Sequence, residues 1–293
     1  MLATVMDGKA LAEEIKSRIA VEVEQLKRNG IKPSLDVVLV GGDPSSQVYV
    51  RGKERDCANV GIGFSLHQLP EDASSGEVVD LVESLNAGRF NGIIVQLPLP
   101  PHIDRRKVLS KIDPVKDVDG LHPENVGRLW LGDYSLQDSL LPCTPKGIVR
   151  LLDRYNIVLE GKLAVIINRS DLVGKPLAKL LLDRNATVAV CHSKTRNLEE
   201  RTREADILVS GVGRAPAFRV TAEMVREGAV VVDVGISHVE GKMVGDVDFE
   251  RVKEKASHIT PVPGGIGPMT RAMLLENVLI AVGLQRGRYG GGQ

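Results

Sequence analysis

Apolar positions recur with two different spacings along this chain, and segments of the two kinds alternate. Between residues 8 and 29 they recur every three or four positions, which predicts an amphipathic helix. Gly30 follows, where a helix commonly ends in the left-handed conformation. Residues 35–40, LDVVLV, form a short continuous apolar run that is typical of a buried strand. The chain is therefore predicted to begin with a helix followed by a buried strand.

The same alternation continues to about residue 100. The next predicted elements are a helix over 45–59, a strand over 62–69, a helix from a cap at Ser74 or Ser75 to about Ala87, and a strand over 92–96. The prolines of LPLPP end the last of these strands, because proline cannot donate a hydrogen bond to a sheet. Strands that alternate with helices predict a mostly parallel sheet with helices on both faces.

A second alternating unit begins near Thr144. Thr144 followed by Pro145 is typical of a helix cap and first turn, and predicts a helix to about Tyr155. The predicted elements that follow are strands over 163–167, 187–191, 206–210 and 229–234, with a helix over about 175–184. This pattern indicates a Rossmann-type domain. A last helix, about 271–283, follows the glycine- and proline-rich segment TPVPGGIGPMT, which could let the chain cross back to the first domain.

The predicted fold class is therefore α/β, with two three-layer αβα domains and an active-site cleft between them. Residues 1–144 are expected to form the first domain, completed by the C-terminal helix at about 270–293. Residues 145–269 are expected to form the second, a Rossmann-type NAD(P)-binding domain.

Composition excludes several classes of function. The 293 residues carry 38 basic and 38 acidic side chains, so no overall charge favours nucleic acid or an anionic membrane. No apolar stretch approaches the length of a membrane span, and the charged first residues do not form a signal peptide. Three scattered cysteines argue against disulfides and fit the reducing cytoplasm, and the six histidines show no metal-binding spacing. We expect a cytoplasmic protein without a metal.

The candidate cofactor site begins with INRSDLVGKP, residues 167–176. It follows a predicted strand and precedes a helix, which is where a doubly wound sheet binds phosphate groups. The glycine-rich dinucleotide fingerprint is not present, since Gly174 is its only glycine. Arg169 and Ser170 instead place a cation and a hydroxyl at the end of the strand.

The next strand ends in CHSKT, residues 191–195. An enzyme that uses NAD commonly has an acidic residue there for the ribose hydroxyl, but this chain has none before Glu199. His192, Ser193 and Lys194, with Arg169 nearby, suit a 2′-phosphate and favour NADP over NAD. A solvated polar loop explains the same residues taken alone. The glycines of SGVGRAP and DVGI are also compatible with a cofactor or with ordinary turns.

Candidate catalytic residues lie in the first half. Tyr49 and Lys53 are four residues apart, so on a helix they share one face and could present a ring and an amine to one substrate. A tyrosine packed on the stem of a surface lysine has the same spacing. Gln96 ends a predicted strand and could hydrogen-bond Lys53, and Asp119 lies in the loop DPVKDVDG between the two halves. Each of the last two is also an ordinary residue at a strand end or a turn.

Together these motifs resemble one known family, the bifunctional methylenetetrahydrofolate dehydrogenase/methenyltetrahydrofolate cyclohydrolases (FolD). The matching stretches occur in family order over nearly the whole chain: YVRGK with the preceding GGDPSS, GIIVQLPLP, DPVKDVDG, LPCTPKG, NRSDLVGKP, CHSKT, VVDVGI, GDVDF and TPVPGGIGPMT. The combination of VQLPLP, DVDG and PVPGGIGPMT is highly specific. The resemblance implies an NADP-linked oxidation of methylenetetrahydrofolate followed by hydrolysis of the methenyl product, in the one-carbon metabolism that serves purine, methionine and histidine synthesis.

The resemblance also implies roles for residues of the first half. Lys53 would be the main catalytic residue, assisted by Gln96, while Tyr49 would contact the pterin-side rings and help to order Lys53. Asp119 would bind the hydrogen-bond donor edge of the pterin.

In the second half, Pro263, Gly264 and Gly265 would line the folate cleft, and a further set would contact NADP: Asn168, Arg169, Ser170, Ser193 and Ile236. The family is typically a homodimer paired through its cofactor domains, and we expect the same here.

One position departs from the family pattern. The family usually has Gly-Arg-Ser where this chain has Asn168-Arg169-Ser170. Glycine there permits a close approach to the cofactor or a positive φ angle, and asparagine tolerates a positive φ better than most residues. The preference for NADP over NAD therefore depends on whether asparagine preserves this turn.

Three alternatives stay open at this stage. One is a relative with only one of the two activities, and another is a two-domain dehydrogenase of the shikimate or amino-acid type. The third is a nucleotide-sensing protein without catalytic activity. The presence of Lys53, Gln96 and Asp119 together favours the bifunctional enzyme.

Overall fold

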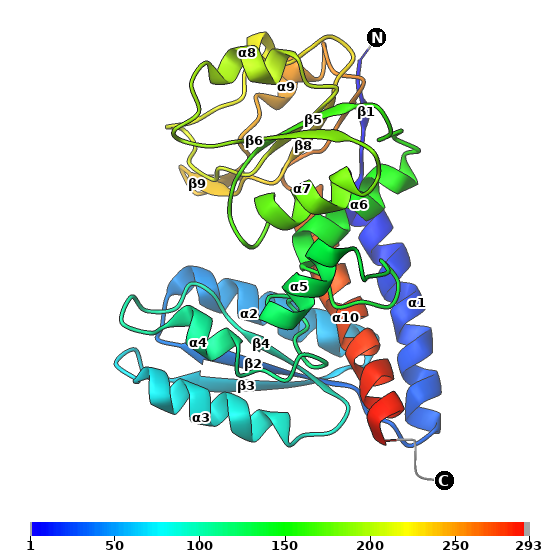
Figure 1. The fold of residues 1–293 in the computed structure, drawn as a ribbon, viewed down its shortest axis with the longest axis vertical. Coiled ribbons are helices and arrows are strands. Elements are labelled where there is room, and N and C mark those ends of the chain that lie inside the picture. The colour runs from blue at the N-terminus through cyan, green and yellow to red at the C-terminus, as the bar shows by residue number, and fades with distance from the viewer. Residues whose placement is uncertain (1, 290–293) are drawn as a thin grey trace. The chain divides into compact units, whose positions relative to one another are not determined.

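A computed structural model describes residues 2–289, and the chain divides into two compact units (Figure 1). The first, here called the three-stranded unit, comprises Glu14–Cys143 and the chain from Arg271 on. The second, the six-stranded unit, comprises the chain up to Glu13 and Thr144–Thr270. Two long helices, α1 (Gly8–Arg28) and α10 (Ile266–Tyr289), pass from one unit to the other along the chain. The α/β class and the second, Rossmann-like parallel sheet are as predicted.

The three-stranded unit is built on a parallel sheet in the order β3 (Gly63–Leu69), β2 (Ser34–Val40), β4 (Asn91–Val95). β2 pairs with a strand on each side and is therefore the central strand of the sheet. This position agrees with its continuous apolar run, which predicted a buried strand. Alternate residues of a strand face opposite sides, and Val38 and Val40 pack with the helices α3 (Ser75–Asn86) and α4 (Arg105–Leu109). The other helices of this unit are α2 (Pro44–Val60) and α5 (Pro123–Leu131).

The predicted start of α3 is confirmed at Ser74. The Ser74 hydroxyl accepts the Glu77 amide at 3.2 Å, and the Glu77 carboxylate accepts the Ser74 amide at 2.8 Å. This reciprocal capping box satisfies two amide groups at the start of the helix.

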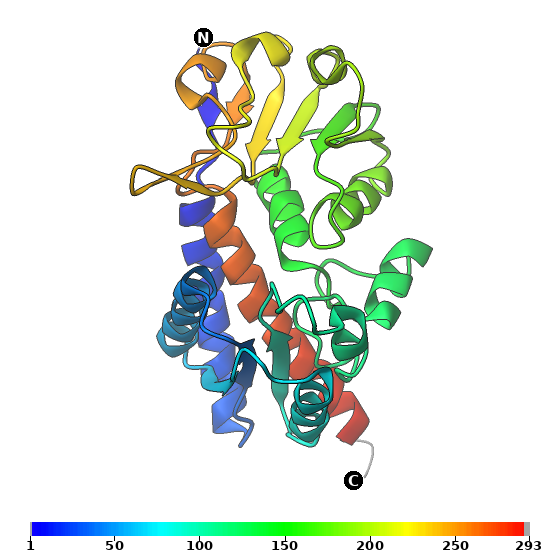
Figure 2. The same cartoon turned by 90° about the vertical axis from the view of Figure 1, so that its left-hand side faces the viewer.

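The six-stranded unit contains a parallel sheet with helices on both faces. Its strands are, in spatial order, β1 (Thr4–Val5), β11 (His258–Ile259), β8 (Val230–Asp233), β7 (Ile207–Ser210), β5 (Leu163–Ile167) and β6 (Thr187–Cys191). The helical elements are α6 (Cys143–Arg154), α7 (Gly174–Leu182), α8 (Leu198–Arg203), η1 (Ala222–Met224) and α9 (Phe249–Val252), and the hairpin strands are β9 (Ser237–Val239) and β10 (Lys242–Val244). Figure 2 shows strands of this sheet side by side, with helices flanking them.

The start of the chain differs from the expected domain division. β1 pairs with β11, so the residues up to Glu13 lie with the six-stranded unit, whereas the sequence analysis began the first domain at residue 1. Strands of two residues, such as β1 and β11, are too short to produce a periodic apolar pattern.

Two helix starts also differ from the predictions. α6 begins at Cys143, so Thr144 lies inside the helix instead of capping it, and its hydroxyl bonds the Thr270 hydroxyl at 2.9 Å. α10 begins at Ile266, five residues before the predicted start at 271. Pro268 lies in the first turn, where its missing amide hydrogen leaves no bond unmade. The part of the predicted C-terminal segment after residue 289 lies outside the described residues.

Among the described residues, one helical segment, Ile266–Gly287, is long and apolar enough to cross a membrane by length and composition alone. In its most apolar window 61% is buried within the protein, as expected for a core helix of a folded domain.

A fully buried lysine anchors the loop that leads to Asp119. Lys116 Nζ donates to the carbonyls of Asn86 and Gly88 and, at 2.9 Å, to Asn91 Oδ1. The Lys116 carbonyl in turn accepts the Ile93 amide of β4 at 2.7 Å. Buried charges persist only with such partners, so this lysine joins the loop to the end of the sheet.

We expect Lys116→Met to destabilise the three-stranded unit by about 3 kcal/mol, because it leaves buried oxygens without a donor. The measurement is the urea midpoint of unfolding. Lys111→Met is the control: Lys111 pairs with Glu83 at 2.9 Å on the surface, and its loss should cost less than about 1 kcal/mol. Equal midpoints for the two variants would contradict the proposed anchor.

Candidate active site

Lys53 and Gln96 meet in the three-stranded unit. Lys53 lies on α2, which follows β2, and its Nζ donates to Gln96 Oε1 at 2.7 Å. Gln96 directly follows β4 and is buried, and its amide donates to the Val38 carbonyl of β2 at 2.8 Å. Its Nε2 donates to the Leu97 carbonyl at 2.6 Å, which fixes the direction of the side-chain amide. The predicted Lys53–Gln96 hydrogen bond is therefore present.

Asp119 reaches the same place because its loop runs along β4. Asp117 forms a parallel bridge with Ile93 of β4, so the segment that ends at Asp119 continues beside the end of that strand. The approach is close: a Cβ on Gly92 would lie 2.3 Å from Val118 Cγ1, so glycine is required there. On the other side, Asn277 of α10 donates to the Val118 carbonyl at 2.8 Å.

Burial opposes charge on both Lys53 and Asp119. Desolvation lowers the pKa of Lys53, and the nearby Asp119 carboxylate only partly opposes this shift. Desolvation raises the pKa of Asp119 to about 6, against the attraction of Lys53. Burial also raises the pKa of the Cys57 thiol, one helical turn from Lys53, to about 12, so this thiol stays neutral. The cluster thus favours an amine that is neutral more often than a surface lysine, held by a neutral acceptor.

Tyr49 lies one turn before Lys53 on α2, with its side chain 44% exposed. The structure therefore brings together Lys53, Gln96 and Asp119, and leaves the Tyr49 ring open to solvent on the same helix. An exposed aromatic ring beside a buried amine is an available surface for a flat ligand.

Sequence reasoning missed the residue that anchors α2. Asp56 is buried, and its carboxylate accepts Lys16 Nζ of α1 at 2.8 Å and pairs with Arg271 Nη1 of α10 at 3.2 Å. Both views in Figures 1 and 2 show α1 and α10 side by side. Asp56 is three residues after Lys53, so this ion-pair network fixes the helix that carries the amine. No sequence motif identified it, because its partners are distant in the chain.

In the six-stranded unit, four strands end level with one another. Ile167 of β5 is in register with Cys191 of β6 and Ser210 of β7, and Ser210 is in register with Asp233 of β8. The loops that follow these strands therefore leave one edge of the sheet, the carboxyl edge where doubly wound sheets bind ligands. These loops contain the five residues predicted to contact the cofactor: Asn168, Arg169, Ser170, Ser193 and Ile236.

Asn168 acts through its side chain, and of the two reasons considered for the family glycine, a close approach to the cofactor or a positive φ, the structure excludes the second. Its φ is not positive. Its Oδ1 accepts the Ser170 amide at 2.8 Å and the Gly174 amide at 3.1 Å, and its Nδ2 donates to the Gly211 carbonyl. Asn168 thus joins the β5 turn, the start of α7 and the loop after β7, which a glycine could not do.

The remaining predicted cofactor residues differ in exposure. Arg169 and Ser193 are exposed at the ends of the neighbouring strands β5 and β6, while Ser170 and Ile236 are partly buried. The turn that contains Ser193 is closed by the His192 amide, which donates to the Thr195 hydroxyl at 2.9 Å. An exposed cation and hydroxyl beside a carboxyl edge suit an anionic group.

The loop with Pro263, Gly264 and Gly265 also belongs to the six-stranded unit. Pro263 is exposed, and the Val262–Pro263 peptide is cis. Gly264 has a φ of 111°, a conformation that side chains rarely adopt, and its carbonyl accepts the Lys9 amide at 2.8 Å. A Cβ on Gly265 would lie 2.6 Å from the Pro261 carbonyl oxygen, so the loop depends on both glycines.

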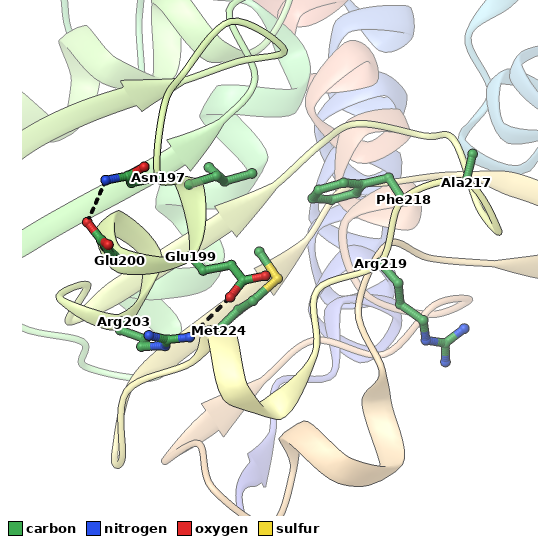
Figure 3. Close-up of a pocket in the computed structure, with 9 residues that line it drawn as sticks. Asn197, Glu199, Glu200, Arg203, Ala217, Phe218, Arg219 and Met224 are labelled. Atoms are coloured by element: carbon green, nitrogen blue, oxygen red, sulfur yellow. Dashed lines mark hydrogen bonds and ion pairs between the residues drawn. The ribbon is translucent and has the colours of Figure 1, made fainter.

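A separate open pocket of about 560 Å³ lies between α8 and the segment that leads to η1. Figure 3 shows that its walls mix apolar side chains, such as Phe218 and Met224, with charged ones, such as the pair Glu199–Arg203. None of the predicted site residues lines it. In residues 2–289, no group of three or more acidic, cysteine or histidine side chains could hold a metal ion.

Comparison with known proteins decides the family. Residues 6–119 match the model of the tetrahydrofolate dehydrogenase/cyclohydrolase catalytic domain, and residues 142–286 match its NAD(P)-binding domain. The chain belongs to the tetrahydrofolate dehydrogenase/cyclohydrolase family. The catalytic-domain match contains Tyr49, Lys53, Gln96 and Asp119, and the second match contains the predicted cofactor residues.

Full-length relatives agree with this assignment. The chain is 52% identical over 288 residues to the bifunctional protein FolD of Thermodesulfovibrio yellowstonii, covering 98% of this chain and 99% of the relative. It is 50% identical over 281 residues to the bifunctional protein FolD of Bacillus subtilis, covering 95% and 97%.

Solved structures of the dehydrogenase/cyclohydrolase family are also similar to this chain. The bifunctional enzyme FolD from Campylobacter jejuni matches with a TM-score of 0.92 and 48% identity, covering 96% of this chain and 99% of that one. FolD of Trypanosoma brucei, solved with NADP and an inhibitor, matches with a TM-score of 0.91 and 37% identity, covering 97% and 98%. Membership of this family excludes the shikimate-type and amino-acid dehydrogenases considered above.

We expect Asp119→Asn to be more stable than the wild type at pH 8, by about 1–2 kcal/mol. An aspartate whose pKa is raised from 3.8 to about 6 on folding makes the folded state progressively less stable as the pH rises between these two values, and the loss is complete above the folded-state pKa. Loss of the attraction to Lys53 reduces the gain. As the pH falls from 6 towards 4, the wild type binds the proton in its folded state first, and the difference should shrink.

Urea midpoints at pH 8, 6 and 4 measure this difference. Asp80→Asn, at an exposed position on α3, is the control and should match the wild type at each pH. A difference for Asp119→Asn that is constant with pH would show that the Asp119 carboxyl is not the titrating group.

Proposed function

We propose that this enzyme oxidises 5,10-methylenetetrahydrofolate to the 5,10-methenyl form with NADP⁺ and then hydrolyses the methenyl form to 10-formyltetrahydrofolate. The observation that carries the proposal is the Lys53–Gln96–Asp119 cluster: an amine with a lowered pKa, hydrogen-bonded at 2.7 Å to a neutral amide and close to a carboxylate. Family membership supports both activities in one chain.

The charge of the substrate explains why a lysine with a lowered pKa is useful. The methenyl group is cationic, so a fully charged ammonium beside it would repel it. A neutral Lys53 amine can accept a proton from the water that attacks the methenyl carbon. Gln96 Oε1 accepts a hydrogen bond from Lys53 Nζ in either charge state, which orients the amine without adding charge.

Asp119 and Tyr49 are proposed to bind the substrate. The Asp119 carboxylate accepts hydrogen bonds, and the amino-pyrimidine edge of a pterin donates them. The exposed Tyr49 ring provides a flat apolar surface next to the amine. The assignment of Pro263, Gly264 and Gly265 to the folate site stays a prediction.

The cofactor proposed for the carboxyl edge of the six-stranded sheet is NADP, which when bound accepts the hydride from the one-carbon bridge. Arg169 and Ser193 are exposed at adjacent strand ends and would hold the 2′-phosphate, since the loop after β6 has no acidic side chain before Glu199. Ser170 and Ile236 would contact other parts of the cofactor, and Asn168 would shape the turn between them. The absence of an acid at the end of β6 is the feature that favours NADP over NAD.

We further propose a homodimer paired through the six-stranded units, in the cytoplasm and without a partner nucleic acid or membrane. β6 is an edge strand of its sheet, and Val190 on it is 38% exposed; Leu182, at the end of α7, is 55% exposed. Apolar side chains at a sheet edge favour pairing with another chain. The three cysteines, Cys57, Cys143 and Cys191, are buried and none of them is in a disulfide, as suits a reducing compartment.

The activity test uses purified enzyme with 5,10-methylenetetrahydrofolate and NADP⁺ or NAD⁺, and separately with methenyltetrahydrofolate alone. We expect faster reduction of NADP⁺ than of NAD⁺, and methenyl decay above the spontaneous rate. Lys53→Met should lower the cyclohydrolase rate by at least about 100-fold, because no amine remains to take the proton. Arg51→Met, an exposed cation on the same helix, is the control and should keep both rates.

Either of two results would overturn this assignment. Full cyclohydrolase activity in Lys53→Met would remove Lys53 from the chemistry. Methenyl decay without reduction of either nucleotide would leave a cyclohydrolase with one activity.

Light scattering should give a solution mass of about twice the 31.7 kDa chain at micromolar concentration. Val190→Lys places a charge at the β6 edge and should shift the mass towards that of a single chain. Val158→Lys is the control at another exposed apolar position, 65% exposed, and should stay dimeric. A wild type with the mass of one chain would contradict the dimer.

A further inference from the structure

Two buried carboxylates lie behind the loops of the carboxyl edge in the six-stranded unit. Asp233 is the last residue of β8 and is 3% exposed, and Asp246 follows the β9–β10 hairpin and is fully buried. Neither pairs with a lysine or arginine in any ion pair of the described residues. Both carboxylates instead accept hydrogen bonds from backbone amides. Burying a carboxylate without a cation costs free energy, which these hydrogen bonds have to offset.

Asp246 holds the loop that follows β7. Its Oδ2 accepts the Ser210 hydroxyl at 2.8 Å and the Val212 amide at 2.6 Å, and its Oδ1 accepts the Gly213 amide at 2.9 Å. Charge-assisted bonds of this length are stronger than those between neutral groups. A single carboxylate therefore determines the path of residues 210–213.

Asp233 holds Asp246 in turn. Its carboxylate accepts the amides of Gly235 at 2.9 Å, Asp246 at 3.1 Å and Val247 at 2.8 Å. Desolvation raises the pKa of Asp233 to about 6, with the charge of Asp246 as a further cause. The two carboxylates thus tie the loop after β8 to the segment that carries Asp246.

Two glycines show how closely this arrangement is packed. A Cβ on Gly235 would lie 2.2 Å from Asp246 Cγ, and a Cβ on Gly245 would lie 2.0 Å from Asp233 Oδ2. Each carboxylate therefore fills the space beside a glycine on the other's segment. The motifs VVDVGI and GDVDF are two halves of one structural device, which their separation in the sequence conceals.

The held loops are those assigned to the cofactor. Ser210 and Asp233 are level with Ile167 at the edge of the sheet, and Asn168 donates to the Gly211 carbonyl. Ile236 comes directly after Gly235, and the Ala215 amide donates to the Ser237 hydroxyl at 3.0 Å, which joins the two loops again. Movement of the Asp246 carboxylate would therefore displace backbone on both sides of the cofactor position.

We propose that Asp246, held by Asp233, is a positioning residue for the nicotinamide cofactor and that dehydrogenase activity depends on it while cyclohydrolase activity does not. The inference rests on the proposed function, since it takes the carboxyl edge as the cofactor site. Cyclohydrolysis uses the Lys53 cluster of the other unit and needs no hydride acceptor. The two activities of one chain thus provide an internal control for correct folding.

The test is Asp246→Asn, with Asp248→Asn as the matched control. Asparagine keeps the shape but offers an NH₂ group to amides that need an acceptor. Asp248 lies two residues away, and its partly exposed carboxylate pairs with Arg219 at 3.5 Å. Asp246→Asn should raise the KM for NADP⁺ at least about tenfold and leave cyclohydrolysis of methenyltetrahydrofolate within twofold of the wild type, while Asp248→Asn changes neither.

Two further measurements keep the inference open to refutation. Hydrogen exchange without cofactor should be at least tenfold faster at Val212 or Gly213 in Asp246→Asn, because one of these two amides then faces an NH₂ group in place of its acceptor. Ser210→Ala removes one neutral donor to Asp246 and should raise the KM for NADP⁺ by a smaller factor. This variant tests the inference if Asp246→Asn does not fold.

The outcomes separate this inference from the proposed function. An unchanged KM for NADP⁺ in Asp246→Asn overturns the inference, and so does a proportional loss of both activities with a lower melting temperature. A wild type that reduces no NADP⁺ defeats the proposed function instead. In that case the Kd for NADP⁺, measured by calorimetry for wild type and Asp246→Asn, decides the inference: equal values or no binding overturn it.

Discussion

The hydrogen bond from Lys53 to Gln96 depends on most of the three-stranded unit. It requires β4 to end at Gln96, α2 to place Lys53 opposite that end, and the Asp119 loop to close beside them. Each condition is met by a separate buried polar contact. The Gln96 backbone amide donates to a carbonyl of β2, and Asp56 pairs with cations of α1 and α10. Lys116 joins the loop to the start of β4. The apolar core supplies the stability, and these contacts determine where the one reactive amine lies.

Two lysines of this unit show that partners, more than burial, decide what a lysine does. Lys116 is fully buried and donates to three oxygens, two of them backbone carbonyls, which uses all three donors of an ammonium group. Lys53 donates to one neutral oxygen while desolvation lowers its pKa. A charged ammonium would leave two of its three donors unsatisfied by that contact, so the neutral amine is favoured. The first lysine is structural and the second is available for proton transfer.

Periodicity predicted the long elements well and the short ones poorly. β2 and α3 have strong apolar patterns and clear caps, so their sequence positions agree with the structure to within a residue or two. β1 and β11 form only through long-range pairing, and no local pattern can reveal a two-residue strand. The start of α10 was missed for a different reason: glycine and proline usually break helices, but both are tolerated in a first turn.

The site residues follow the same division between local and long-range information. Tyr49 and Lys53 were identifiable from their spacing on one helix, and Gln96 from its place at a strand end. Asp56 and Asp246 were not, because their partners come from segments up to 215 positions away in the case of Asp56 and Arg271. Asn168 shows the limit most clearly. The resemblance to the family indicated a missing glycine, which permits a close approach to the cofactor or a positive φ, whereas the Asn168 side chain bridges two loops and its φ is not positive.

The two units position their sites with buried side chains of opposite hydrogen-bonding character. Parallel strands end together, so a ligand at that edge meets loops whose backbone is held without secondary structure. In the six-stranded unit, the Asp246 carboxylate accepts backbone amides of a loop at that edge. In the three-stranded unit, Lys116 donates to the carbonyls of Asn86 and Gly88, just before the start of β4, and its own carbonyl accepts the Ile93 amide. The buried lysine therefore aligns the segment that leads to Asp119 with β4, and this segment reaches Gln96 at the other end of the strand.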